Sequence, residues 1–160
     1  MPKEKFPMTQ AIRTLRDHRV DFILRSYDYI ERGGTSAAAS GLRVDEHQVI
    51  KTLVMEDDHK NPLVVLMHGD KEVSTKALAR VLGVKTITPC DPETAHKHTG
   101  YMVGGTSPFG TKKSLRVYLE KSILDLPRIY INAGKRGLLA EMAPEDLKRI
   151  LDPIPVEVAI

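Results

Sequence analysis

The amino-acid sequence predicts a single domain of the mixed α/β class. Its 160 residues are enough to bury a substantial core without disulfides. Apolar runs with strand character are interspersed with capped, amphipathic helical segments, and no linker, repeat or low-complexity tract divides them. Because strands and helices alternate irregularly, we expect one mixed domain over residues 1–160 and not a regular βαβ array.

Helices are predicted where a capping residue precedes apolar residues of helical spacing. Thr9 precedes 10-QAIRTLRDH-18, in which Ala11, Ile12 and Leu15 share one face. Proline suits the first position of a helix and glycine the residue after its end. The other predicted helices are a short Ala-rich helix ending near Gly41, a helix over 76–83 that Ser74 or Thr75 begins and Gly83 ends, a helix over 91–100 that Asp91 and Pro92 begin and Gly100 ends, and a final helix over 144–151.

Strands are predicted where β-branched and aromatic residues gather between turn signals. The strongest candidates are 48–56 and 62–70, and the polar residues 56–61 between them favour a hairpin. Further strands are predicted over 20–29, 84–88, 114–120 and 128–132.

The composition, with 41% hydrophobic and 28% charged residues, is ordinary for a soluble globular protein. The net charge of +3, from 24 Lys+Arg against 21 Asp+Glu, permits a nucleic-acid partner without requiring one. Cys90 is the only cysteine, which excludes an internal disulfide framework and a cysteine-based zinc site. It lies between Pro89 and Asp91 with no evident base, so we expect it to be inert.

Targeting signals are not apparent. The N-terminal segment MPKEKFPMTQ has basic residues but no apolar run behind them, so no signal peptide is expected. No apolar run approaches the roughly 20 residues that a membrane span requires. We therefore expect a cytoplasmic protein with no membrane partner.

The stretch 100-GYMVGGTSPFGTKK-113 is rich in glycine and raises the question of a phosphate-binding loop. Gly105 and Gly110 have the spacing of such a loop, but Thr111 stands where its lysine is required, and Pro108 lacks an N–H donor. The adjacent glycines 104 and 105 instead leave two alternatives. Their bare backbone can present N–H donors to a developing oxyanion, or it can form a tight turn with positive φ.

Lys51 interrupts an apolar row on the strand predicted over 48–56. With strand alternation it shares a face with Val49, Leu53 and Met55. A buried lysine without a partner is costly, so Lys51 should reach a sheet edge, a carboxylate or an anionic ligand. The alternative is an ordinary solvated lysine.

The segment 133-AGKRGLLAEM-142 places Lys135 and Arg136 between glycines, where they could contact phosphates or form an exposed hairpin tip. The six histidines show no metal-ligand pattern, and no G-x-S-x-G motif is present. With no evident protein nucleophile, an enzyme built on this chain would use water guided by backbone donors and a cation. We expect no metal and no cofactor.

Taken in order, several segments resemble the YbaK family, the bacterial aminoacyl-tRNA deacylases related to the inserted editing domain of prolyl-tRNA synthetases. The resemblance covers nearly the whole chain. It implies a central, partly barrel-like mixed β-sheet flanked by helices, and hydrolysis of the ester between an amino acid and tRNA. The segments are 9-TQAIRTLRDHRVDF-22, 27-YDY-29, 50-IKTLV-54, 74-STKALARVLG-83, 99-TGYMVGGTSPFGTKK-113 and 129-IYINAGKRGLLAEMAPEDL-147.

The resemblance also implies roles for individual residues. Lys51 matches the lysine that is most closely tied to activity in the family, and Gly104 and Gly105 would direct N–H groups at the ester carbonyl. Each good oxyanion donor is worth roughly 3–4 kcal/mol, which would make a catalytic triad unnecessary. The expected substrate contacts are Tyr27, Thr52, Ser107, Asn132, Lys135 and Arg136.

Two departures from the family pattern concern the expected pocket. Many members have Ser where this chain has Asn132, and Asp where it has Leu139. The missing carboxylate could have held the α-ammonium group of the substrate or a water. Glu141 lies two residues further on, on the same side of an extended strand, and is the candidate substitute.

These inferences lead to a trans-acting aminoacyl-tRNA deacylase, most directly for Cys-tRNA(Pro) or Cys-tRNA. The expected partners are the acceptor end of aminoacyl-tRNA and prolyl-tRNA synthetase. Deacylation of Ala-, Ser- or Thr-tRNA remains open. So do a tRNA-binding or regulatory module without hydrolytic activity and, with less support, a hydrolase for another small acyl ester. The oligomeric state is not predicted.

Overall fold

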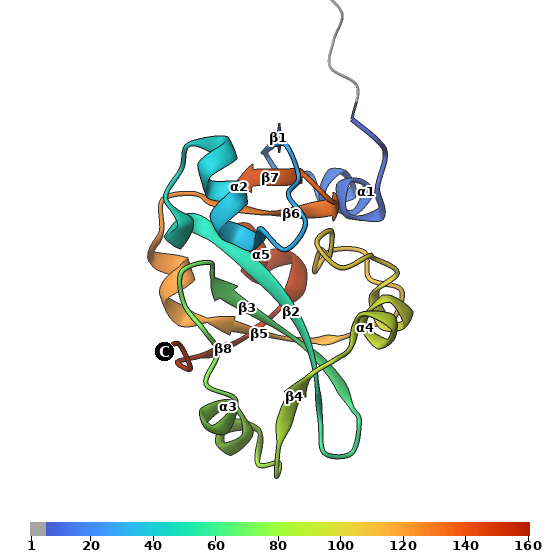
Figure 1. The fold of residues 1–160 in the computed structure, drawn as a ribbon, viewed down its shortest axis with the longest axis vertical. Helices are drawn as coiled ribbons and strands as arrows, with labels where there is room; N and C mark the ends of the chain where they lie inside the picture. Colours follow the sequence, from blue (N-terminus) through green and yellow to red (C-terminus); the bar gives the residue numbers. More distant parts are fainter. Residues whose placement is uncertain (1–5) are drawn as a thin grey trace, which may run out of the picture.

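Eight strands form one mixed sheet, and the computed structural model describes residues 6–160 (Figure 1). Residues 1–5, part of the segment considered for a signal peptide, lie outside the described residues. The elements are α1 (Gln10–Asp17), β1 (Phe22–Ser26), α2 (Gly34–Leu42), η1 (Glu46–Gln48), β2 (Val49–Asp57), β3 (Pro62–His68), α3 (Thr75–Leu82), β4 (Ile87–Pro89), α4 (Pro92–Thr99), β5 (Arg116–Glu120), η2 (Lys121–Asp125), β6 (Ile129–Lys135), β7 (Leu138–Met142), α5 (Glu145–Leu151) and β8 (Ile154–Val156).

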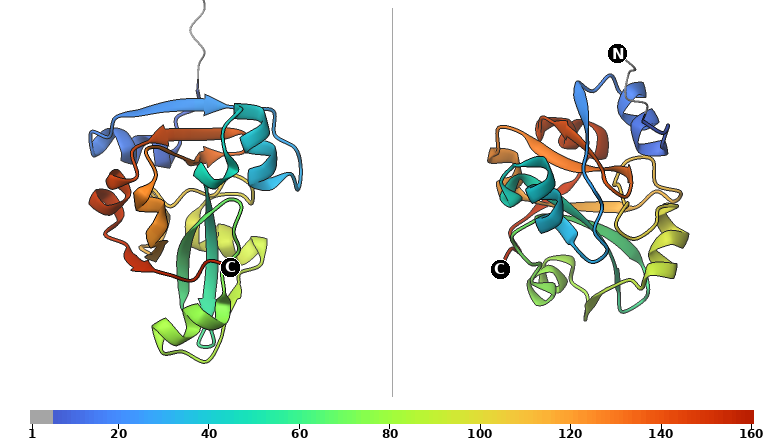
Figure 2. Two further views of the ribbon diagram at one scale, coloured as in Figure 1. Left: turned by 90° about the vertical axis from the view of Figure 1, so that its left-hand side faces the viewer. Right: turned by 45° about the horizontal axis from the view of Figure 1, so that its top comes forward.

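The strand order is β1-β7-β6-β2-β3-β5-β8, with β4 attached separately to β2. The left view of Figure 2 shows how strongly the sheet turns, because β1 and β7 run across the top of the molecule while β2 and β3 run down it. The β2–β3, β6–β7 and β1–β7 pairs are antiparallel, whereas β2–β6, β3–β5 and β5–β8 are parallel. The expected single mixed α/β fold is therefore confirmed.

Strand β2 has two different neighbours along one edge. Its first residues pair with β6, as Val49↔Tyr130 and Ile50↔Ile131, and its last residues pair with β4, from Met55 onward. Residues 51–54 have no strand partner on that edge among residues 6–160. We call this stretch the β2 gap. It lies at the point where the sheet diverges, and it contains Lys51.

The predicted helices form where their capping residues direct them. The side chains of Thr9, Ser74 and Asp91 accept hydrogen bonds from backbone N–H groups in the first turns of α1, α3 and α4. Gly83 and Gly100 end α3 and α4 in the left-handed conformation. These helices are confirmed, as is the hairpin of β2 and β3.

The structure also differs from the strand predictions. The strand expected over 84–88 is the shorter β4, and β1 is shorter than 20–29. Strand β6 continues to Lys135, and β7 is the extended segment expected around Glu141, although its bounds were not predicted. Strand β8 was not predicted. The glycines at 134 and 137 suggest a loop, but a register shift between Asn132 and Lys135 accommodates Gly134 inside the hairpin.

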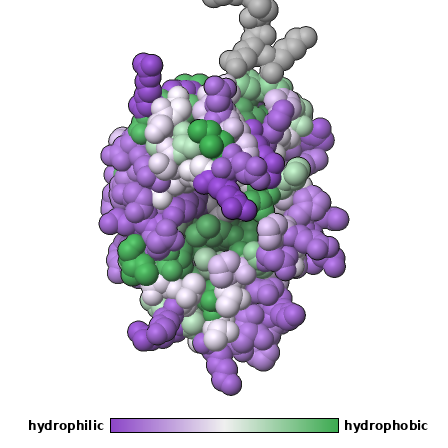
Figure 3. Space-filling view, in the orientation of Figure 1, coloured by the Kyte–Doolittle hydropathy of each residue, from purple (hydrophilic) through white to green (hydrophobic). Residues whose placement is uncertain are grey.

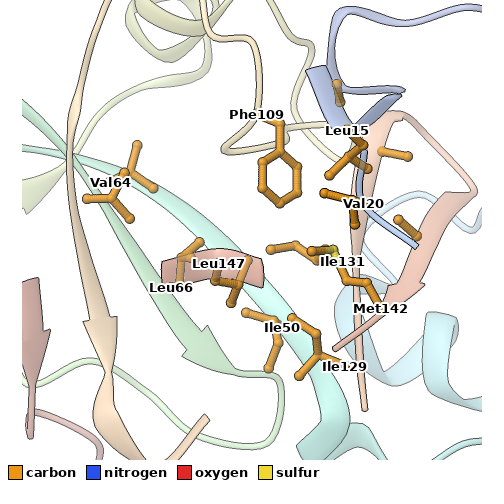
Figure 4. Packing of buried hydrophobic residues seen from close by; sticks show 14 of the residues in the cluster. Leu15, Val20, Ile50, Val64, Leu66, Phe109, Ile129, Ile131, Met142 and Leu147 are labelled. Carbon is orange, nitrogen blue, oxygen red and sulfur yellow. The ribbon is translucent and has the colours of Figure 1, made fainter. Parts of the chain in front are cut away.

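The largest core cluster lies on one face of β2 and β3, where Ile50 and Leu66 meet Ile131 from β6 and Phe109 from the glycine-rich loop (Figure 4). Phe109 is fully buried and anchors that loop in the core. The opposite face of β2 and β3 packs against α2 and α3 through two smaller clusters. None of the helices formed by residues 6–160 is long and apolar enough to cross a membrane.

A candidate site beside the gap in strand β2

Lys51 projects from the face of β2 that packs against α2 and α3. It pairs in register with Met67, which belongs to the cluster on that face. The side chain is 18% exposed, and its Nζ donates to the backbone oxygen of Lys71 at 2.7 Å and lies 3.4 Å from Glu72 Oε1. The expectation that Lys51 reaches a carboxylate is confirmed, and the pair sits at the surface beside the β2 gap.

The register of β2 and β6 relates Lys51 to Asn132. Paired residues of parallel strands project to the same face, and Ile50 pairs with Ile131. The following residues, Lys51 and Asn132, therefore share the opposite face. The Asn132 side chain contacts the backbone oxygen of Gly104 at 3.1 Å, so Gly104 lies on the same face of the sheet as Lys51, whereas Phe109 of the same loop packs in the core on the other face.

Asn132 joins the glycine-rich loop to the turn between β6 and β7. Its Nδ2 donates to the backbone oxygens of Gly104 and Lys135, at 3.1 and 3.2 Å. Its Oδ1 accepts from the N–H groups of Gly134 and Lys135, at 2.7 and 3.2 Å. The Asn132 side chain thus connects the glycine-rich loop to the β6–β7 turn through hydrogen bonds to both backbones.

The two adjacent glycines have different roles. Gly104 has a φ of +87°, and a Cβ there would meet the Tyr29 hydroxyl at 2.7 Å, so a side chain is excluded on both counts. Its N–H donates to no described residue. The N–H of Gly105 is already used, since it donates to Met102 O at 2.8 Å, and a Cβ at Gly105 would press on the backbone of Arg136. Both expected alternatives are thus present: a tight turn, and one open backbone donor.

Lys135 and Arg136 occupy the β6–β7 turn and are exposed. Arg136 Nε donates to Val103 O at 2.8 Å, and its guanidinium carbon lies over the ring of Tyr29, 5.1 Å from the centroid. The turn is therefore a hairpin tip, and it is also attached to the glycine-rich loop.

Tyr27 packs in an apolar cluster with Leu139, Val49 and Tyr130 under α2. Burial, with a smaller contribution from Tyr29, raises the pKa of the Tyr27 hydroxyl. On its other side Tyr27 borders a groove of about 860 Å³ between the segment after β1 and α2. Leu139 is 4% exposed and belongs to this cluster, so the position where the family pattern has aspartate is part of the buried core here.

Thr52 and Ser107, two of the expected substrate contacts, do not lie on the face of the sheet that carries Lys51 and Gly104. Thr52 faces Leu66, on the opposite side of β2 from Lys51. Its hydroxyl is buried and has no hydrogen-bond partner among residues 6–160. Ser107 is fully buried, and its hydroxyl accepts from the N–H of Phe109, which supports the loop from inside.

Glu141, the candidate substitute for the missing aspartate, is occupied. Its two carboxylate oxygens contact Arg25 at 2.7 Å and Arg128 at 3.2 Å. Arg25 also lies over the ring of Tyr130. A carboxylate held by two guanidinium groups is poorly placed to bind an ammonium group as well.

The space-filling view shows a hollow over the middle of β2, with hydrophobic residues at its floor and a strongly hydrophilic side chain projecting over it (Figure 3). In the same orientation α2 lies on the viewer's side of the sheet (Figure 1), and α2 packs on the face of β2 that carries Val49 and Lys51, so the hollow lies on that face. A small acyl group could enter it, because its floor is apolar and its rim is polar.

Other reactive groups are less suited to chemistry. His47, His68 and Asp70 lie close enough to share a metal ion. However, the two imidazole rings are stacked at 3.7 Å and only 5° from parallel, so their in-plane lone pairs cannot converge on one ion. Burial, with Glu56 and Asp91, raises the pKa of the Cys90 thiol to about 11, which agrees with an inert cysteine.

Two residues of the site were not predicted. Tyr29 contacts Gly104 and Arg136, and its sequence signal is its position in 27-YDY-29. Glu72 is the carboxylate beside Lys51, but residues 51 and 72 are brought together only by the β2–β3 pairing and the loop after it. No sequence pattern indicates that contact.

The fold and the site define a mixed α/β protein in which a strand lysine and a glycine-rich loop share one face of the sheet. Residues 33–150 match the family described as the aminoacyl-tRNA editing domain, and the chain belongs to that family. It is 31% identical over 140 residues to EbsC of Enterococcus faecalis (strain ATCC 700802 / V583), named as a candidate Cys-tRNA(Pro)/Cys-tRNA(Cys) deacylase. That match covers 86% of this chain and 84% of EbsC.

The chain is also similar to part of a synthetase. It is 32% identical over 99 residues to the proline–tRNA ligase of Streptococcus equi subsp. zooepidemicus (strain H70), which covers 62% of this chain but 16% of the ligase. The crystal structure of a candidate trans-editing enzyme for prolyl tRNA synthetase matches with a TM-score of 0.82 at 18% identity, over 96% of this chain and 99% of that one. This likeness concerns the fold alone.

Proposed function

We propose that this protein hydrolyses the ester that joins an amino acid to the 3′ end of tRNA, acting in trans. The observation that carries the proposal is the placement of Lys51 and the open N–H of Gly104 on one face of the sheet, beside the β2 gap. Membership of the aminoacyl-tRNA editing domain family supports the reaction class.

In the proposed reaction, water adds to the ester carbonyl and the ribose oxygen leaves with a proton. Gly104 N–H would stabilise the developing oxyanion. Lys51 would neutralise negative charge on the carbonyl oxygen or the terminal phosphate, in exchange for its present contact with Glu72. The attacking water would be positioned by the substrate's free ribose hydroxyl, or by its thiol if the amino acid is cysteine.

The decisive experiment is Lys51→Ala in a deacylation assay with mischarged tRNA. We expect kcat/KM to fall at least about 100-fold, as for loss of an oxyanion-stabilising group. The protein should remain folded, with the free energy of unfolding lowered by about 1–2 kcal/mol, because the largely buried Lys51 side chain also loses its hydrogen bond to Lys71 O. Lys71→Ala is the matched control, because it removes an equal charge from the adjacent, exposed residue. Full activity in Lys51→Ala would refute the mechanism.

We propose cysteinyl-tRNA, on tRNA(Pro) or tRNA(Cys), as the substrate. The support is the similarity to EbsC, which is named as a candidate Cys-tRNA(Pro)/Cys-tRNA(Cys) deacylase. A panel of tRNAs charged with Cys, Ala, Ser, Thr and Pro tests it, with Lys51→Ala assayed in parallel. Faster release of alanine, serine or threonine than of cysteine would reassign the substrate.

A second candidate function is RNA binding without hydrolysis, and one observation favours it. Leu139 is apolar and Glu141 is held by two arginines, so neither offers a carboxylate to the substrate. This function predicts salt-dependent binding of aminoacyl-tRNA with no release of amino acid over a long time course.

Association with prolyl-tRNA synthetase, proposed from the shared domain, is tested by co-purification with that enzyme.

A further inference from the structure

Tyr29 and Arg136 form a cation–π pair at the edge of the candidate site. The guanidinium carbon of Arg136 lies 5.1 Å from the centroid of the Tyr29 ring. Arg136 Nε is fixed by its hydrogen bond to Val103 O, which restricts where the guanidinium can lie. Because Arg136 is exposed while Tyr29 is partly buried beneath it, the pair presents a planar cationic group to solvent.

Three exposed apolar residues are close in the sequence to Tyr29 or to Gly104, which Tyr29 contacts. Met102 is 61% exposed and Val103 is 47% exposed, and both directly precede Gly104. Ile30 follows Tyr29 and is 60% exposed. Isolated exposed apolar residues are ordinary, but three of them beside one arginine–aromatic pair form a surface suited to a flat, partly apolar ligand.

The charge and the position of this surface indicate the ligand. Lys135 is exposed in the same turn, so two cations adjoin the apolar residues. The Tyr29 hydroxyl lies against Gly104, which carries the open N–H. Single-stranded nucleic acid has the matching chemistry, because its bases stack on aromatic rings and guanidinium planes while its phosphates meet lysine or arginine.

We propose that Tyr29 and Arg136, flanked by Ile30, Met102 and Val103, form a stacking platform for a base of the unpaired 3′-terminal nucleotides of the RNA substrate. The inference rests on the proposed function, because it assigns the nucleotide subsite next to the ester. A base held there would fix the terminal ribose beside Gly104, so the platform would position the substrate and Gly104 would act on it.

The test uses an uncharged acceptor-stem minihelix whose 3′-terminal adenine is replaced by the fluorescent base 2-aminopurine. Binding is followed by anisotropy of a dye at the 5′ end, and stacking by quenching of the base in the saturated complex. We expect quenching with wild-type protein. In Tyr29→Ala we expect loss of quenching and about tenfold weaker binding, the usual effect of losing one stacking partner.

A matched pair of variants separates stacking from charge. Arg136→Lys keeps the charge but loses the planar group, so quenching should fall while the salt dependence of binding persists. Lys135→Ala removes an equal charge next to it and should weaken binding while quenching in the saturated complex is retained. Tyr29→Phe should behave as wild type.

Binding without quenching, equal quenching in Tyr29→Ala, or no binding of the minihelix would each overturn the platform. None of these results requires hydrolysis, so the assay stands apart from the Lys51→Ala deacylation test. The two assays can therefore give different answers. Amino acid release without base quenching would refute only the platform, and base quenching without amino acid release would refute only the proposed hydrolysis.

Discussion

Asn132 uses its entire side-chain amide to hold two backbone segments together. Both donor and acceptor atoms are engaged, with Gly104 and Lys135 on one side and with Gly134 and Lys135 on the other. A serine at this position is too short to reach both segments. The departure from the family pattern is therefore a local change in how the glycine-rich loop is supported.

Replacing Asn132 by alanine should loosen this connection. We expect the free energy of unfolding to fall by about 1–3 kcal/mol, because partly buried backbone groups lose their partners. Hydrogen exchange at Gly134 and Lys135 should become faster. Thr106→Ala is the control, since the Thr106 hydroxyl makes one long contact in the same loop, at 3.4 Å. An unchanged exchange rate at Gly134 would contradict the assigned role.

His68 is a buried histidine that is held in one neutral form. Its Nδ1 must donate to His47 O, because a carbonyl only accepts, and its Nε2 then accepts from the Ser122 hydroxyl. Burial lowers the pKa of His68 below its ordinary value. In the unfolded chain the same residue titrates near its ordinary pKa of about 6.5.

Stability should therefore decrease as the medium is acidified. Below a pH of about 6.5 the unfolded state takes up a proton that folded His68 resists, at a cost of up to about 1.4 kcal/mol per pH unit. Urea unfolding of wild type and His68→Asn between about pH 7.5 and about pH 5 measures this, and the variant should show a flatter profile. Equal slopes would show that His68 does not determine this pH dependence.

At the scale of elements, the glycine-rich loop between α4 and β5 is anchored at both ends. Phe109 is buried in the main core, and the Tyr101 hydroxyl donates to Phe109 O at 2.6 Å. Burial raises the pKa of Tyr101 to about 12, so this hydroxyl stays protonated as a donor. The loop can thus keep Gly104 fixed although its middle is exposed.

Removing that anchor should destabilise the loop. Tyr101→Phe leaves the buried Phe109 carbonyl without its partner, which should cost about 1–3 kcal/mol of unfolding free energy. Tyr118→Phe is the matched control, because Tyr118 is also buried but lies in a different core cluster, on the other face of the sheet from Phe109. Equal effects of the two substitutions would show that the Tyr101 hydrogen bond is not an anchor.

Elements with a local signal were predictable from the sequence, and elements that depend on long-range pairing were less so. The starts of α1, α3 and α4 could be predicted from Thr9, Ser74 and Asp91, because a capping residue contacts only the first turn of its own helix. Strand β7 follows a glycine and pairs with β1, over one hundred residues away, and β8 is a short edge strand. The contact of Lys51 with Glu72 likewise depends on the assembled sheet.

At the scale of the whole molecule, the small net charge of +3 makes RNA binding a local property of the site. Lys135→Ala should reduce the slope of log K against log salt by about 0.7, the value for one phosphate contact on a single strand. Lys85→Ala, which removes a charge just before β4, should leave the slope unchanged. A filter-binding titration over several salt concentrations provides the measurement, and equal slopes in the two variants would argue against a phosphate contact at Lys135.

The β2 gap has a mechanical consequence. Among residues 6–160, only two residue pairs, Val49↔Tyr130 and Ile50↔Ile131, connect the β1-β7-β6 half of the sheet to β2. The aminoacyl end of a tRNA that contacts both Lys51 and Gly104 would add a further connection between β2 and the β1-β7-β6 half of the sheet. Binding of this end at the candidate site should then slow amide hydrogen exchange of residues 129–131, although the ligand need not contact these residues.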